Sequence, residues 1–129
     1  MSRKALEDYD MYMKGIQKEP VVRGEVSSGE SFVLLDLSKM KSVSSDFSVA
    51  TFTDCNLTRT EFRLCQMSGV LFENCDLTRS RFSECKLLGS IFVACRMNSA
   101  SFEGCAMDNY VIRGCVVDGI EFRGNSYQI

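Results

Sequence analysis

The chain has 129 residues, of which 45% are hydrophobic and 25% are charged, and its net charge is −2. This length predicts one domain, and this composition is typical of a soluble protein. A net charge so close to zero argues against a nucleic-acid-binding surface, which is normally strongly basic, and gives no support to a strongly acidic one.

No membrane or export segment is recognisable. No apolar run reaches the roughly 18 residues that a membrane-spanning helix needs. The opening stretch, MSRKALEDYDMYMKG, carries charges throughout and lacks the apolar centre of a secretory signal. The seven cysteines are an odd number without an export signal, so we expect free thiols in a reducing compartment. Together these features predict a cytoplasmic protein.

The first expected element is an amphipathic helix near residues 3–15. Ser2 can cap its start and Gly15 can mark its end. Its apolar side chains recur at helical spacing, at Ala5, Leu6, Tyr9, Tyr12, Met13 and Ile16. Two roles are open for this helix, a cap on the fold that follows or an element that binds a partner. Residues 17–30, QKEPVVRGEVSSGE, are typical of a linker with room for one short strand, so residues 1–30 form the expected N-terminal region.

From Phe47 onward the sequence repeats every five residues. A large apolar residue, here called the centre, stands at every fifth position through Tyr127. A mostly small residue, here called the slot, precedes each centre by two positions. The slot holds every cysteine of the chain, namely Cys55, Cys65, Cys75, Cys85, Cys95, Cys105 and Cys115. A period of five is too long for a strand and too short for a helix-turn-helix unit, so it predicts a repeat architecture.

Units such as CNLTR, CDLTR, CKLLG and TEFRL resemble those of the pentapeptide-repeat family over roughly residues 31–127. The resemblance implies an all-β solenoid, a right-handed quadrilateral β-helix with one five-residue unit on each side of the coil. A short strand followed by a corner suits such a unit. We therefore expect about five coils over residues 31–129, stacked about 4.8 Å apart with parallel pairing.

Because four units form one coil, centres that lie four units apart in the sequence are expected to stack into inner columns. Centre and slot both point inward, because residues two apart on a strand share a face. One column holds Phe52, Phe72, Phe92 and Ile112, and the opposite column holds Phe62, Phe82, Phe102 and Phe122. No coil can bury its core alone, so stability is expected to come from neighbouring coils.

The two ends of the repeat look different from its middle. Upstream, Phe32 and Leu37 keep the phase but position 42 is Ser, so we expect an irregular first coil over residues 31–50. Downstream, bulky residues stand in the slot of the last coil, and no helix is expected after it. Solenoid ends carry strand edges that favour association. A homodimer joined at this end by two-fold symmetry is therefore predicted, through Tyr110, Ile120, Phe122, Tyr127 and Ile129.

The cysteines are expected to be small buried residues rather than reactive groups. In the quadrilateral coil they form two ladders on opposite walls, one running from Cys55 to Cys115 and one from Cys65 to Cys105. Stacked side chains run parallel and meet disulfide torsions poorly, and opposite walls do not converge on a zinc ion. Buried thiols in apolar surroundings are poor nucleophiles. The chain also has no His and no phosphate-cradling glycine pattern, so we expect no enzyme, no metal and no cofactor.

One wall of the expected solenoid carries an apolar outer stripe. The residue before each centre points outward, and on this wall Leu71, Ile91 and Val111 follow Thr51, with Val93 beside Ile91. An apolar stripe on a small rod usually marks a contact surface. Two occupants are open: the N-terminal helix folded back onto the wall, or a protein partner or second subunit.

Two classes of function compete. The first is a non-catalytic binding module, a rigid rod that presents its surfaces to a protein partner. The second follows from the resemblance, because FENCDL and FSECKL are similar to units of the quinolone-resistance proteins, which bind DNA gyrase or topoisomerase IV by imitating duplex DNA. Residues 46–123 contain ten acidic and eight basic residues. This mixture favours the first function, because a DNA mimic needs dense negative charge. A secreted effector or a fragment of a longer protein is a third alternative.

Overall fold

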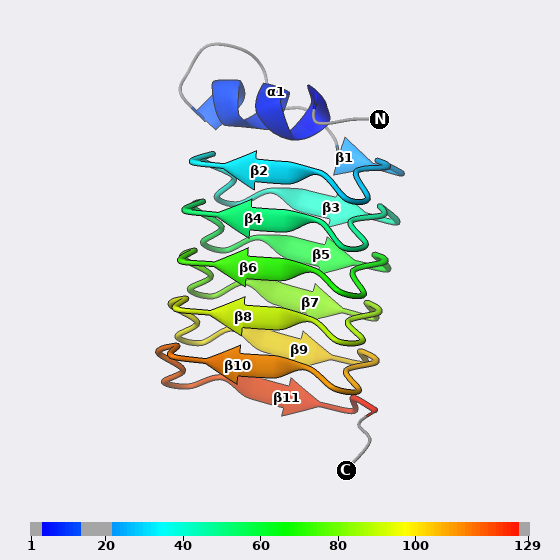
Figure 1. The fold of residues 1–129 in the computed structure, drawn as a ribbon, viewed down its shortest axis with the longest axis vertical. Coiled ribbons are helices and arrows are strands. Elements are labelled where there is room, and N and C mark those ends of the chain that lie inside the picture. The colour runs from blue at the N-terminus through cyan, green and yellow to red at the C-terminus, as the bar shows by residue number, and fades with distance from the viewer. Residues whose placement is uncertain (1–3, 14–21, 127–129) are drawn as a thin grey trace.

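Short parallel strands alternate between two opposite walls of a four-sided coil in the computed structural model, which describes residues 4–13 and 22–126 (Figure 1). One sheet, here called the five-strand wall, contains β2 (Ser31–Val33), β4 (Thr51–Thr53), β6 (Leu71–Glu73), β8 (Ile91–Val93) and β10 (Val111–Arg113). The other, here called the six-strand wall, contains β1 (Val22–Arg23), β3 (Lys41–Val43), β5 (Glu61–Arg63), β7 (Arg81–Ser83), β9 (Ser101–Glu103) and β11 (Glu121–Arg123). Isolated parallel bridges, such as Asn56 with Asp76 and Gln66 with Lys86, complete the two remaining walls. The predicted quadrilateral β-helix of about five coils is confirmed.

The register stacks identical residues inside the rod. Phe52 lies opposite Phe72, whose ring is stacked on it with centroids 5.0 Å apart. Across the interior the two columns meet edge to face, as Phe72 and Phe82 do with ring centroids 6.1 Å apart. Stacked and edge-to-face contacts both suit the quadrupole of an aromatic ring. Both predicted aromatic columns are therefore present, and they form one continuous core.

The corners explain why the unit has five residues. From residue 24 to residue 124, the residue two positions after each centre has a positive φ, so the chain turns after each short strand. Gly69 adopts this conformation at φ 71 without a side-chain penalty. Val49 adopts it at φ 50, which is costly for a β-branched residue. The solenoid thus imposes the corner on whatever residue stands there.

Helix α1 (Lys4–Met13) lies over the first coil, at the end of the rod opposite the C-terminus (Figure 1). Leu6 and Tyr9 are buried in the core cluster. The Tyr9 hydroxyl donates to the carbonyl oxygen of Ser38, and the amide of Asp36 donates to Oδ1 of Asp10 at 2.6 Å. The predicted helix is confirmed, and it is a cap.

This cap replaces backbone hydrogen bonds that another coil would make. One coil further along, the amide of Asn56 donates to the Leu35 carbonyl, and the Thr58 carbonyl accepts from the Lys39 amide. Asp36 and Ser38 hold the same two positions on the first coil. Side chains of α1 therefore satisfy an edge donor and an edge acceptor that would otherwise need other partners.

The expectation of an irregular first coil over residues 31–50 is wrong. β2 and β3 pair in the same register as later strands, and the pairing already begins at Val22 of β1, ahead of the boundary placed after residue 30. Ser42 takes a centre position and is fully buried, with its hydroxyl donating to Oγ of Ser45 at 3.1 Å. Met40, fully buried in the slot two positions earlier, supplies the missing volume. The backbone pairing thus tolerates a small centre when its neighbour is large.

Replacing Asp10 with Ala should lower the free energy of unfolding by about 1–3 kcal/mol, because the Asp36 amide loses its acceptor in a partly buried place. Urea denaturation of the variant and the parent measures this difference. Glu103→Ala removes an exposed carboxylate far from α1 and should change little. Equal losses in the two variants would contradict the capping role of Asp10.

Candidate functional site

The predicted apolar stripe lies on the outside of the five-strand wall. Leu71 on β6 pairs with Ile91 on β8, which pairs with Val111 on β10, and Val93 stands beside Ile91 on the same outer face. Ile91 is 36% exposed, and the other three side chains are half-buried by their neighbours on the wall. Since α1 covers the end of the rod and not this wall, the predicted alternative of a helix folded back onto the stripe is wrong (Figure 1).

The same wall carries a second apolar area that the sequence analysis missed. Val33 at the end of β2 and Leu34 directly after it are exposed, Leu34 by 71%. Polar Thr51 lies between the two areas and donates from Oγ1 to Oγ of Ser31 at 2.9 Å. Both missed residues stand after a centre, at outward positions that could have been read from the repeat.

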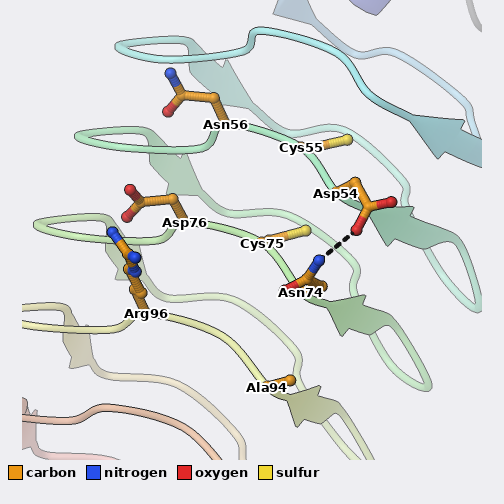
Figure 2. A pocket seen from close by; sticks show the side chains of 8 residues that line it. All are labelled: Asp54, Cys55, Asn56, Asn74, Cys75, Asp76, Ala94 and Arg96. Carbon is orange, nitrogen blue, oxygen red and sulfur yellow. Dashed lines mark hydrogen bonds between the residues drawn. The ribbon is translucent and has the colours of Figure 1, made fainter.

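A polar hollow of about 460 Å³ opens beside the wall, at its corner with the next one (Figure 2). It is lined by Asp54, Cys55, Asn56, Asn74, Cys75, Asp76, Ala94 and Arg96. The side-chain amide of Asn74 donates to Oδ1 of Asp54 at 2.6 Å. Thr78 donates to Oδ1 of Asp76 from both its backbone amide and its hydroxyl. The carboxylates are therefore engaged in holding neighbouring coils and turns together, which is a structural role.

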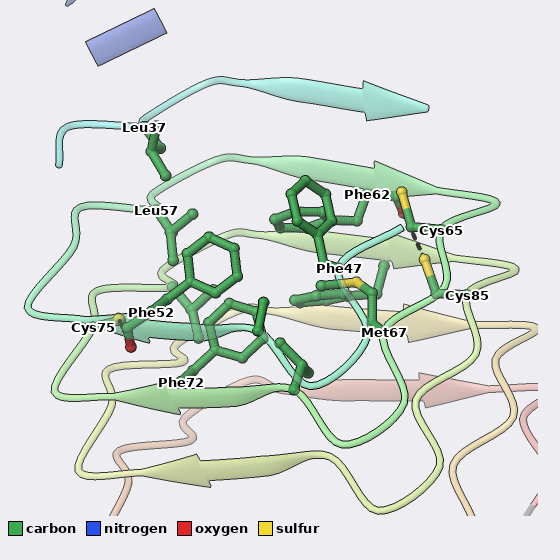
Figure 3. Close-up of a cluster of buried hydrophobic side chains, with 14 of the residues drawn as sticks. Leu37, Phe47, Phe52, Leu57, Phe62, Cys65, Met67, Phe72, Cys75 and Cys85 are labelled. Atoms are coloured by element: carbon green, nitrogen blue, oxygen red, sulfur yellow. Dashed lines mark hydrogen bonds between the residues drawn. The ribbon is translucent and has the colours of Figure 1, made fainter. Parts of the chain in front are cut away.

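The cysteine ladders lie where the sequence predicted them, on the two bridge walls, and the described cysteines are free thiols. Each Sγ donates to a main-chain carbonyl of the preceding coil, as Cys75 does to Phe52 at 3.2 Å and Cys85 does to Phe62 at 3.2 Å. Neighbouring thiols of a ladder also interact, as Cys65 and Cys85 do (Figure 3). The slot on these walls thus receives a small apolar residue that also carries a donor, and only the first property was predicted.

These contacts make Cys75 and Cys85 poor nucleophiles, whereas the hydrogen bond with Cys85 lowers the pKa of Cys65 to about 7. The hydrogen bond with Cys55 raises the pKa of Cys75, and the contact with Cys95 and burial act in the same direction. The hydrogen bond with Cys105 likewise raises the pKa of Cys85. A thiol that stays protonated is a weak nucleophile and a weak metal ligand. In the described part of the chain, no group of three or more Cys, Asp or Glu side chains could hold a metal ion.

The C-terminal coil is the more open end of the core. Phe122 stacks on Phe102 with centroids 5.2 Å apart and lies 5.9 Å from the ring of Tyr110. Tyr110, Ile120 and Phe122 are half-buried, and Val117 is 38% exposed. Tyr127 and Ile129 lie outside the described residues. A homodimer joined at this end therefore stays a prediction.

No helix in residues 4–13 and 22–126 has the length and apolar character needed to cross a membrane. Among curated proteins, no sequence matches the chain.

Several solved structures align with the chain at low sequence identity. QnrB1, a plasmid-mediated fluoroquinolone resistance protein, aligns with a TM-score of 0.48 and 20% identity over 83% of this chain and 69% of its own. HetL, involved in heterocyst differentiation regulation in the cyanobacterium Nostoc, has a TM-score of 0.39 and 18% identity over 81% of this chain and 46% of its own. Rfr23 from the cyanobacterium Cyanothece has a TM-score of 0.31 and 13% identity over 95% of this chain and 99% of its own.

The family assignment depends on the repeat itself. A sequence model described as pentapeptide repeats (9 copies) matches residues 72–116, and one described as pentapeptide repeats (8 copies) matches residues 43–74. Together the two matches extend from residue 43 to residue 116, more than half of the chain. These are the residues whose centres and slots fill the coils described above. The chain therefore belongs to the pentapeptide-repeat family.

Proposed function

We propose that this chain is a non-catalytic binding module, a rigid rod that presents its five-strand wall to a protein partner. The observation that carries the proposal is the uncovered apolar stripe in which Leu71, Ile91 and Val111 lie in register on neighbouring strands, with Val93 beside Ile91. Apolar area of this kind on a small protein typically marks a contact surface. The parallel stacking holds the four side chains in a rigid array, so little conformational entropy is lost when a partner binds.

The buried chemistry supports a binding role over a catalytic one. The chain has no His, its carboxylates at the hollow accept hydrogen bonds from Asn74 and Thr78, and its thiols donate to main-chain carbonyls. None of these groups forms a nucleophile with an adjacent general base, which covalent catalysis requires.

A DNA-mimicking binder of DNA gyrase or topoisomerase is the second candidate, and the charges on the six-strand wall weigh against it. In one outer column Lys41, Glu61 and Arg81 lie in register on neighbouring strands. On the last two strands of this wall Glu103 lies opposite Arg123. A protein that imitates duplex DNA has to repeat negative charge along its length, and alternating signs cancel that field.

Cross-linking with a matched pair of variants, together with a gyrase supercoiling assay, distinguishes the two candidates. Ile91→Lys places a charge in the stripe, while Ser101→Lys places the same charge at the equivalent position of β9 on the other wall. We expect the protein partner that cross-links to the parent chain to cross-link to Ser101→Lys as well, but not to Ile91→Lys. Loss with both variants, or with neither, would contradict the proposal. Inhibition of gyrase supercoiling by the parent chain would favour the second candidate instead.

A further inference from the structure

The outer surface of the five-strand wall is ordered in two columns. On β6, β8 and β10 the residue before the centre forms an apolar column of Leu71, Ile91 and Val111, which lie in register. The residue after each centre forms a second column, in which Glu73, Val93 and Arg113 lie in register on the same strands. β8 is therefore apolar in both columns, with an acidic residue one coil before it and a basic residue one coil after it.

The two charges border the apolar residues of β8 on either side. Glu73 and Arg113 are both exposed, and two coil rises, about 9.6 Å, separate them along the rod with Val93 in between. Within the described residues, neither side chain forms an ion pair. An acidic and a basic group thus border an apolar patch at equal distances from its middle strand.

We propose that the five-strand wall binds the same wall of a second copy, with the two rods antiparallel and a two-fold axis lying along β8 in the plane of the interface. This symmetry keeps each column opposite itself and reverses the order of the coils. Ile91 and Val93 then face their own counterparts. Leu71 faces Val111 of the other copy, and Glu73 faces Arg113 of the other copy, twice per dimer.

Other symmetric arrangements of the same wall fit less well. A two-fold axis along the rod would place column against column, so that Leu71 faces Glu73 and Val111 faces Arg113, with a charge against an apolar side chain in each case. A two-fold axis parallel to the strands but midway between β6 and β8 would place Glu73 opposite Val93 and Arg113 opposite Thr53. Only the axis along β8 matches apolar groups with apolar groups and opposite charges with each other.

The proposed contact is small, which sets its expected strength. Only β6, β8 and β10 of each copy face one another, because the rods overhang beyond them. Sheets packed face to face lie about 10 Å apart, and a stable interface normally buries at least about 1,200 Å² in total. We therefore expect a weak dimer that forms with rising protein concentration and loosens with salt, because its two charge pairs lie at the rim. The inference rests on the proposed function, since it names the partner of the same stripe.

Sedimentation velocity of the whole chain, from low to high micromolar concentration at low salt, measures the dimer constant. Glu73→Arg and Arg113→Glu should each weaken the dimer about tenfold, because each creates two like-charge contacts. The double variant Glu73→Arg with Arg113→Glu restores opposite charges across the two-fold axis, so its dimer constant should return to within about threefold of the parent's. Ile91→Lys should abolish the dimer, while Ser101→Lys on the six-strand wall should leave it intact. Unfolding midpoints of all variants verify that each one is folded.

Three results would overturn the inference. A parent chain that stays monomeric at every concentration would do so, as would a double variant that is weaker than both single variants. A dimer that survives Ile91→Lys but dissociates with Val117→Lys would place the contact at the C-terminal coil instead. The dimer and the proposed function can fail independently. If the parent chain is monomeric but Ile91→Lys still abolishes cross-linking to another protein, the dimer is refuted and the binding module is retained.

Discussion

Phe82→Ala should lower the free energy of unfolding by about 3–5 kcal/mol. The Phe82 ring is 1% exposed and lies 5.1 Å from Phe62 and 4.8 Å from Phe102, stacked on both. It also meets Phe72 and Phe92 edge to face, each at 6.1 Å. Removing it opens a cavity at the junction of both aromatic columns, where paired backbones on every side limit collapse. Urea denaturation monitored by circular dichroism measures the loss.

An outward residue of the same repeat is the control for this variant. Arg59 is exposed at a corner, so Arg59→Ala should change the free energy of unfolding by less than about 0.5 kcal/mol. If both variants lost the same free energy, the division of the repeat into inward and outward positions would be refuted.

Gly69→Ala should be the most damaging of the small corner substitutions, with an expected loss of about 2–3 kcal/mol. Gly69 has φ 71, and a Cβ there would lie 2.9 Å from Cγ1 of Val49 on the preceding coil. Val49 is itself β-branched at φ 50 and cannot turn away easily. The variant therefore suffers both backbone strain and a steric clash between neighbouring coils.

Two comparisons separate the strain from the clash. Gly89 has φ 65, and a Cβ added there would meet nothing within 4 Å, so Gly89→Ala should lose only the backbone contribution, about 1 kcal/mol. In the Gly69→Ala variant, Val49→Gly should restore the part of the free energy of unfolding that the clash removed, because it takes away the clashing methyl group. A double-mutant cycle on thermal or urea unfolding measures this coupling. Independent, additive effects at positions 49 and 69 would show that the two coils do not touch there.

Much of the interior could be predicted from the sequence, because a five-residue period repeated without a gap leaves few alternatives. Phe52, Phe72 and Phe92 had to share one column once four units made a coil, and their stacking follows from in-register pairing. Prediction was weaker where the repeat is imperfect. Ser42 broke the pattern in the sequence, yet the neighbouring strands and Met40 keep the first coil regular.

The candidate surface was only partly accessible to the same reasoning. Leu71, Ile91, Val93 and Val111 were placed on one wall from their spacing alone. The opposed charges of Glu73 and Arg113 gain meaning only in the folded wall, where the register aligns them on either side of Val93. The donor role of the cysteines was also missed, since the carbonyl that Cys75 reaches belongs to Phe52 on the preceding coil.

The five-residue period and the inward-pointing side chains can be read from the sequence, because alternation along each short strand and a corner after it are local properties of five residues. The role of α1 and the set of outer residues that form a surface depend on how the coils are stacked. Tyr9 and Asp10 find Ser38 and Asp36 through space, across 29 and 26 residues of chain. Contacts of that kind depend on how coils and cap are stacked, and no local pattern encodes them.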